Sequence, residues 1–263
     1  MRSPSEQLEF FKTKLGKTQP KLPLGLFEKD IMRCNLDVLW AALKAEESFV
    51  QRMKRANPDS RAAVLRNYHV ASALIAQLYP VFFVFESAWR TYVATCLDEI
   101  YGTDDWWHGV RDLVAQGADP MSVATLGRLP ARSLVTKEVG YILSTVALPS
   151  GLESTYALTN HATMKSLEIL IDSHWREMSV PFTATMSLGK PTSSVFQALF
   201  KRVRDARNQA FHQRVVTDRG AAVKAAEQLM DLLDVHLGDR VKAIAEATVA
   251  PLEFTVIREA RHG

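Results

Sequence analysis

The sequence predicts an all-α protein of one domain, and three observations favour this fold class. Apolar residues recur at helical spacing along most of the chain, and no stretch has the alternation and turn residues of a convincing β-hairpin. The 263 residues include only 12 glycines and 11 prolines, which argues against a loop-rich β protein. No Pro/Gly/Ser-rich linker divides the chain, so we expect a single α-helical domain over residues 1–263.

The first half of the chain is expected to form two long helical stretches. Residues 30–55 predict a helix, because their apolar residues roughly track one face. The segment Asn57-Pro58-Asp59 breaks it, and a second stretch follows over residues 61–101. Pro80 must kink this stretch or divide it into two helices. Gly102-Thr103-Asp104 then predicts a stop and a new N-cap.

The second half contains an irregular segment and several shorter helices. Residues 116–132 have the weakest helical pattern, and we expect a loop with a short helix there. A second loop is expected over residues 181–191. The remaining helices are expected over residues 135–146, residues 160–175 with Asn160 as the N-cap, residues 192–214 and residues 223–247.

Composition and charge predict a soluble cytoplasmic protein. The formal net charge is +3 and the pI is near 8.8, so contact with a polyanion requires a local basic patch. Cys34 and Cys96 form neither a CxxC pair nor a disulfide framework, which favours a reducing compartment. The N-terminus lacks the apolar core of a secretory signal. The longest apolar run, Leu78–Phe85, is far shorter than the roughly 20 residues of a bilayer span, so we expect no membrane contact.

The most informative motif is the hexapeptide Arg207-Asn208-Gln209-Ala210-Phe211-His212, near the end of an Arg-rich helix. An arginine offers a planar fork of donors to a phosphate. A histidine can accept a proton from a ribose 2′-hydroxyl or donate one to a leaving 5′-oxygen near neutral pH. Asn208 can orient a phosphate or the imidazole. Because the sequence has no metal-ligand cluster and no nucleotide-binding loop, this pattern points to metal-independent chemistry on RNA.

Helical spacing decides which of these side chains can meet. At about 100° per residue, Arg204, Asn208 and His212 lie nearly above one another. Arg207 precedes His212 by five residues, so in an ideal helix the two side chains diverge by about 140°. Long side chains, or a break in the helix near His212, are needed to bring them together.

A basic face accompanies the motif. Lys201, Arg204 and Arg214 can attract an RNA backbone, so we predict that they contribute to RNA binding. The alternative is a solvated basic face without function, which is a common property of helices.

Three segments of the chain together resemble the HEPN superfamily. Residues 207–212 are similar to its R-x4-6-H signature, in the frequent form R-N-x-x-x-H. Phe85–Arg90, followed by Tyr101–Trp107, resembles the Glu-x-x-x-Arg helix and the Gly…Trp-Trp ending of Abi-like HEPN proteins. Ile171–Trp175, followed by Phe182, resembles their stretch of a hydrophobic residue and Trp followed later by Phe. The three segments occur in the order of that family.

The resemblance covers roughly residues 60–240 and carries expectations about fold and activity. It implies a HEPN-like helical bundle in that core, with additional helices and an N-terminal helical extension over about residues 1–58. It implies a metal-independent endoribonuclease without a cofactor, often acting in phage defence by abortive infection or in a toxin–antitoxin system. Such proteins usually form homodimers that place two motifs in one cleft, and an antitoxin or other regulatory protein is an expected partner.

Carried over residue by residue, Arg207 and His212 are the catalytic pair and Asn208 is their polar neighbour. The chain departs from common members of the family just after this pair. Gln213 follows His212 where His, Asn or Glu is frequent, and Arg214 replaces a tyrosine found in some toxin subfamilies. Regulation through such a tyrosine is therefore in doubt, whereas the catalytic pair is intact.

Other polar and aromatic residues have structural as well as functional interpretations. Glu86 and Arg90 are four residues apart beside an apolar stripe, so they predict a partly buried ion pair. This pair is either purely structural or supports the Arg207/His212 site from a neighbouring helix. Trp106-Trp107 is expected in the core rather than stacked on bases. The histidines lack paired ligand spacing, so no metal site is predicted.

The leading hypothesis is RNA cleavage through attack by the 2′-hydroxyl, which leaves a 2′,3′-cyclic phosphate. His212 would act as the acid and base, and Arg207 would stabilise the charged phosphorane. One alternative is a HEPN-like module that binds RNA, a nucleotide or a protein without cutting. The other is a structural dimerisation domain.

Overall fold

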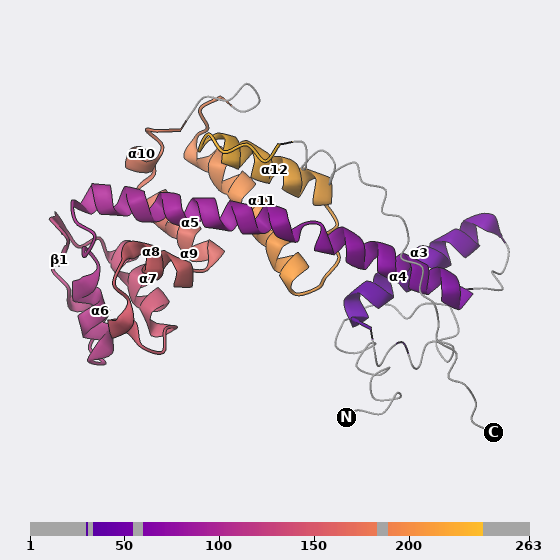
Figure 1. Ribbon diagram of the computed structural model, residues 1–263, viewed down its shortest axis with the longest axis horizontal. Helices are drawn as coiled ribbons and strands as arrows, with labels where there is room; N and C mark the ends of the chain where they lie inside the picture. Colours follow the sequence, from indigo (N-terminus) through magenta and orange to yellow (C-terminus); the bar gives the residue numbers. More distant parts are fainter. Residues whose placement is uncertain (1–29, 31–33, 55–59, 183–188, 239–263) are drawn as a thin grey trace. The chain divides into compact units, whose positions relative to one another are not determined.

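The computed structural model describes residues 30, 34–54, 60–182 and 189–238 of the chain. The described part is mostly helical, as the sequence predicts (Figure 1). Its residues group into two compact units. The small unit comprises residues 1–79, 208–217 and 246–263, and the large unit comprises residues 80–207 and 218–245. Each unit has a core of its own. The single domain expected from the sequence stays a prediction.

In the described residues of the small unit, two helices pack together, α3 (Leu36–Met53) and α4 (Ser60–Ala76). Asn35 caps α3, because its Oδ1 accepts the backbone N–H of Val38 at 3.1 Å. Within residues 30–55, where a helix is expected, the structure describes the helix Leu36–Met53. The two helices pack through four buried apolar side chains: Leu39, Ala42, Leu43 and Val64.

The other helices that the structure describes lie mainly in the large unit. The helix α5 begins at Tyr79, which belongs to the small unit, and the rest of α5 belongs to the large unit. Residues 208–211, at the end of α11, also belong to the small unit. The bounds are α5 (Tyr79–Tyr101), α6 (His108–Ala115), η2 (Pro120–Ser122), α7 (Ser133–Ser144), η3 (Pro149–Gly151), α8 (Thr155–His161), α9 (Met164–Ser173), α10 (Trp175–Met178), α11 (Ser193–Phe211) and α12 (Arg219–Asp231).

An aromatic cluster forms the core of the large unit. Trp89 on α5 is fully buried and meets Phe196 and Phe200 of α11 edge-on, with ring centroids 5.2 and 5.8 Å apart. Phe182 closes the cluster from the segment after α10. In Figure 1, α5 runs through the large unit with α7, α8 and α9 on one side and α12 on the other. Burial of large aromatic side chains of this kind stabilises a fold strongly.

The Trp-Trp pair lies in the core, as predicted. Trp106 and Trp107 are both buried, and both indole N–H groups donate to the Thr155 hydroxyl at 3.2 Å. Gly127 approaches the same region so closely that an added Cβ would lie 2.6 Å from the Tyr101 carbonyl oxygen. Its φ of +52° also favours glycine, and it forms the turn between β1 (Thr125–Leu126) and β2 (Leu129–Pro130). This short antiparallel hairpin lies in the segment expected to be irregular.

Two predicted helix boundaries are wrong. Asn160 lies inside α8, and α9 is instead capped by Thr163, whose hydroxyl accepts the N–H of Ser166 at 3.0 Å. The helix expected over residues 223–247 ends at Asp231, because Asp234 takes a left-handed conformation with a φ of +57°. Asp tolerates this conformation better than most residues, and the N–H of the following Val235 bonds back to Met230. Residues 239–247 lie outside the described part.

Within the described residues, one helical stretch is long and apolar enough to cross a membrane by length and composition alone. It covers residues 61–101, with a mean hydropathy of 1.5 in its most apolar window, of which 28% is buried. Core helices of soluble proteins pass the same test. The cytoplasmic location therefore stays a prediction.

Candidate functional site

The Arg-His motif lies at the C-terminal end of α11. Arg207 and Asn208 are in the helix, and His212 is the first residue after it. The N–H of His212 still bonds to the Asn208 carbonyl at 3.0 Å, so the backbone keeps helical geometry up to this residue. A break in the helix near His212 was one of two ways to bring Arg207 and His212 together. The helix breaks after His212 rather than before it.

A Schellman motif makes this break. The N–H of Gln213 bonds to the Ala210 carbonyl at 2.8 Å, and the N–H of Arg214 bonds to the Gln209 carbonyl at 2.7 Å. Gln213 has a φ of +54°, the left-handed conformation usually taken by glycine at this position. The side chains of His212, Gln213 and Arg214 are exposed on the resulting turn.

Arg207 is held by a carboxylate of the large unit. Its Nε lies 2.6 Å from Oε1 of Glu86 on α5, and the two side chains are 26% and 15% exposed. The contact is a close pairing of opposite charges rather than an aligned hydrogen bond, and it holds the guanidinium beside α5. Glu86 thus contacts Arg207 directly, and its supporting role at the site stays a prediction.

Arg90 is the second guanidinium beside the same carboxylate. Its Nη2 lies 4.0 Å from Oε2 of Glu86, the pair predicted from the four-residue spacing. Its Nη1 donates to the carbonyls of Thr159 and Ala162, at and just past the C-terminal end of α8. Burial lowers the pKa of Arg90, while the charge of Glu86 opposes this effect. Arg90 therefore ties α8 to the carboxylate that holds Arg207.

The basic face of α11 is neutralised in part by acidic neighbours. Arg204 is only 13% exposed and pairs with Glu168, a buried carboxylate of α9. Lys201 is exposed and pairs with Asp205 at 2.7 Å along the helix. Helical spacing gave no signal for Glu168, because it is 36 residues from Arg204 in sequence. The RNA-binding roles of Lys201 and Arg204 stay predictions.

The His212 end of the motif belongs to the small unit. The Tyr79 hydroxyl donates to the Ala210 carbonyl at 3.1 Å, and its ring packs edge-on against Phe211 at 5.1 Å. Asn35, the cap of α3, donates from Nδ2 to Oε1 of Gln213 at 3.4 Å. Arg214 is 64% exposed and lies 3.8 Å from Asp37. Sequence reasoning had given Tyr79 and Asn35 no role at the site.

A buried histidine elsewhere in the large unit is structural. His174 is fully buried, with Nε2 2.9 Å from the Tyr101 hydroxyl and Nδ1 2.9 Å from the Leu170 carbonyl. The carbonyl can only accept, so Nδ1 carries the proton and Nε2 accepts from the hydroxyl. Burial lowers the pKa of His174, and the Leu170 carbonyl works in the opposite direction. Among the described residues, no group of three or more His, Cys, Asp or Glu could hold a metal ion.

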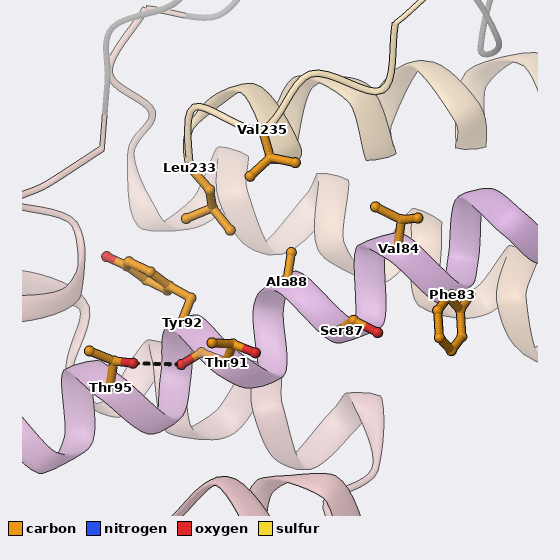
Figure 2. A pocket seen from close by; sticks show the side chains of 9 residues that line it. All are labelled: Phe83, Val84, Ser87, Ala88, Thr91, Tyr92, Thr95, Leu233 and Val235. Atoms are coloured by element: carbon orange, nitrogen blue, oxygen red, sulfur yellow. Dashed lines mark hydrogen bonds between the residues drawn. The ribbon is translucent and has the colours of Figure 1, made fainter.

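An apolar groove of about 580 Å³ lies on the outer face of α5 in the large unit. Figure 2 shows Leu233 and Val235, from the turn after α12, above the α5 face that carries Val84 and Ala88. Phe83, at one end of this groove, is 69% exposed. The groove has no charged lining residue, so it lacks the electrostatic attraction on which binding of an RNA backbone depends.

Comparisons of this chain with protein-family models, with curated proteins and with solved structures found no match.

Proposed function

We propose that this protein is a metal-independent endoribonuclease of the HEPN type, with a HEPN-like helical bundle in its core. One observation carries the proposal: Arg207 is paired with the mostly buried carboxylate of Glu86, and an exposed His212 follows on the next turn. A guanidinium held in place and an accessible imidazole are two groups that can support RNA cleavage by 2′-hydroxyl attack. The motif resemblance adds the family and its biological setting of phage defence or toxin–antitoxin control.

In the proposed reaction, the ribose 2′-oxygen attacks the adjacent phosphorus. The P–O5′ bond breaks, and a 2′,3′-cyclic phosphate remains on one product. His212 takes the 2′-hydroxyl proton or delivers a proton to the leaving 5′-oxygen, and Arg207 stabilises the additional negative charge on the phosphorane. Asn208, exposed on the same helix, orients the phosphate or the imidazole. In a homodimer, a second motif can supply the other proton-transfer group.

A second candidate function is binding without cleavage. The pairing of Arg204 with Glu168 and of Arg207 with Glu86 favours it, because both guanidiniums already have acidic partners within the chain. A phosphorane carries more negative charge than a bound phosphate, so these carboxylates oppose cleavage more strongly than they oppose binding. In this case, Arg207→Ala would lower affinity for RNA, a nucleotide or a protein partner, and there would be no turnover to lose.

The decisive experiment is incubation of purified protein with total RNA in EDTA, with wild type beside His212→Ala and Arg207→Lys. We expect wild-type cleavage with 2′,3′-cyclic phosphate ends, identified by mass spectrometry. Loss of one proton-transfer group should lower the rate about 100-fold or more. Lysine keeps the charge but loses the planar fork, so Arg207→Lys should be impaired as well. His236→Ala is a matched control, because His236 is also exposed but pairs with Asp231 outside the motif.

Each other outcome has a definite meaning. Equal cleavage by wild type and His212→Ala would show that His212 is not the catalytic residue. Loss of all cleavage in EDTA would contradict the metal-independent mechanism. Absence of cleavage together with RNA binding that Arg207→Ala weakens would favour the binding function. Light scattering tests the expected homodimer, and a strict monomer would remove the basis for a shared cleft.

A further inference from the structure

Besides the apolar groove of the large unit, the structure has a cavity in the small unit, beside the turn that carries His212. Its volume is about 180 Å³, and Gln213, the residue after His212, is one of its walls. Tyr68 of α4 and Tyr79 contribute aromatic rings, Val38 and Ile75 contribute apolar surface, and Asn35 contributes an amide. Ligand pockets for drug-sized molecules are usually larger than about 300 Å³. This cavity therefore suits one planar ring system rather than a larger ligand.

Two side-chain amides, those of Asn35 and Gln213, are among the polar groups that line this cavity. Oδ1 of Asn35 accepts the N–H of Val38, and the N–H of Asn35 donates to the Tyr68 hydroxyl at 3.0 Å. These bonds fix Asn35 from both sides. Its Nδ2 reaches Oε1 of Gln213 at 3.4 Å, a distance near the outer limit for a hydrogen bond. The contact between the two amides is therefore weak and can be exchanged for bonds to a ligand.

Gln213 itself occupies a strained backbone position. A left-handed conformation costs a residue with a Cβ roughly 1 kcal/mol more than it costs glycine. Glycine would thus serve the helix end better, yet the chain has a long amide there, with its side chain on the wall of the cavity. A strained residue that lines a cavity is a reason to look for a ligand.

We propose that this cavity binds one nucleobase of the RNA, next to the phosphate handled at His212, and sets the sequence preference of cleavage. The inference rests on the proposed function. Proteins commonly recognise single-stranded RNA by stacking a base on an aromatic ring such as tyrosine and by hydrogen bonds to the edges of that base. This cavity has tyrosine rings and side-chain amides, which can make these two kinds of interaction. An amide pairs with adenine through one donor and one acceptor, so adenine is the preferred base.

Gln213→Gly is the sharpest test variant, because it keeps the left-handed backbone and removes only the amide. Asp234→Gly is its matched control, since Asp234 occupies the same left-handed position after α12 and lines neither the cavity nor the motif. Ser72→Leu provides an independent test by filling the cavity from α4, where leucine is a good helix former.

The probes are four oligonucleotides that differ only in one central base, each made as ordinary RNA and as its 2′-O-methyl form. The methylated form lacks the attacking hydroxyl, so fluorescence anisotropy reports base preference without cleavage. We expect wild type and Asp234→Gly to prefer adenine by roughly tenfold or more, and Gln213→Gly and Ser72→Leu to lose this preference.

The two readouts separate this inference from the proposed function. A base preference in binding that Gln213→Gly removes, without cleavage by wild type, would support the cavity and overturn the nuclease. Cleavage with no base preference, or with a preference that both Gln213→Gly and Ser72→Leu retain, would overturn the cavity and leave the nuclease intact. Absence of both cleavage and base preference would overturn both.

Discussion

Arg207 and His212 are five residues apart in sequence, but they are held in different ways. Arg207 is part of the large unit, where a short ion pair to Glu86 and a helix packed on an aromatic cluster restrain it. His212 is part of the small unit, on an exposed turn restrained by a hydroxyl bond from Tyr79 and a weak amide contact from Asn35. Arg207, for which phosphate binding is proposed, is thus restrained, whereas His212, for which proton transfer is proposed, is exposed.

This difference suits the two tasks proposed for them. Stabilisation of a charged phosphorane depends on a donor that is already in place, because reorganisation during the reaction costs free energy. Proton transfer requires an imidazole that can contact both substrate and solvent. Substitutions at each end should therefore differ in kind: those near Arg207 should affect folding and activity together, and those near His212 should affect mainly activity.

The largest effect is expected from Glu86→Gln, which breaks the restraint on Arg207. Removal of one partner from a mostly buried ion pair leaves an uncompensated charge, so the free energy of unfolding should fall by about 2–4 kcal/mol. Urea denaturation followed by circular dichroism measures this change. Glu99→Gln, at an exposed position of the same helix, should cost less than about 0.5 kcal/mol.

A double-mutant cycle separates the ion pair from other effects of the substitution. Glu86→Gln combined with Arg207→Gln should cost clearly less than the sum of the two single substitutions. Additive costs would mean that the two side chains do not interact in solution. Arg207 would then not be restrained by Glu86.

A smaller effect is expected from acid, through the buried His174 of the large unit. Its folded-state pKa lies below the unfolded value of about 6.5. Below that pH, His174 becomes protonated in the unfolded chain but stays neutral in the folded chain. The free energy of unfolding therefore falls as pH decreases, by at most about 1.4 kcal/mol per pH unit. His174→Gln should flatten the dependence of Tm on pH between 7 and 5. An unchanged slope would assign the acid sensitivity to another group, such as His69, whose pKa burial also lowers.

The smallest effect is expected at the His212 end, from Tyr79→Phe. This change removes one half-buried hydroxyl bond to the Ala210 carbonyl and should cost about 1 kcal/mol. Tyr92→Phe removes a bond of the same type, to Met178 in the large unit, and provides a matched comparison. We expect the rate of RNA cleavage to fall in Tyr79→Phe only. An equal loss of rate in both variants would point to a general effect on folding.

Local features of the fold were predictable because they depend on neighbours in sequence. The helical fold class and the helix over residues 192–214, observed as Ser193–Phe211, follow from apolar spacing. The Glu86–Arg90 pair follows from the four-residue spacing. Helix ends were harder, since the left-handed conformations of Gln213 and Asp234 occur at residues other than glycine. A pattern that relies on glycine as a stop signal passes over both.

The surroundings of the candidate site were not predictable from spacing. Glu86 lies 2.6 Å from Arg207, although more than a hundred residues separate them in sequence. Asn35 and Gln213 are also more than a hundred residues apart in sequence, and their side chains are in contact. A single sequence records neither contact, because tertiary packing decides which helices meet. The motif could thus be located from the sequence, whereas the carboxylate that orients Arg207 and the cavity beside Gln213 required the structure.

The distribution of tryptophan gives each unit its own optical reporter. Of the five tryptophans, only Trp40 belongs to the small unit, where it packs half-buried against α4, and the other four belong to the large unit. Trp40→Phe would restrict intrinsic fluorescence to the large unit, and the difference from wild type would isolate the signal of the small unit. Coinciding denaturation curves would mean one cooperative domain, and separate curves would mean that the turn carrying His212 can open while Arg207 stays folded.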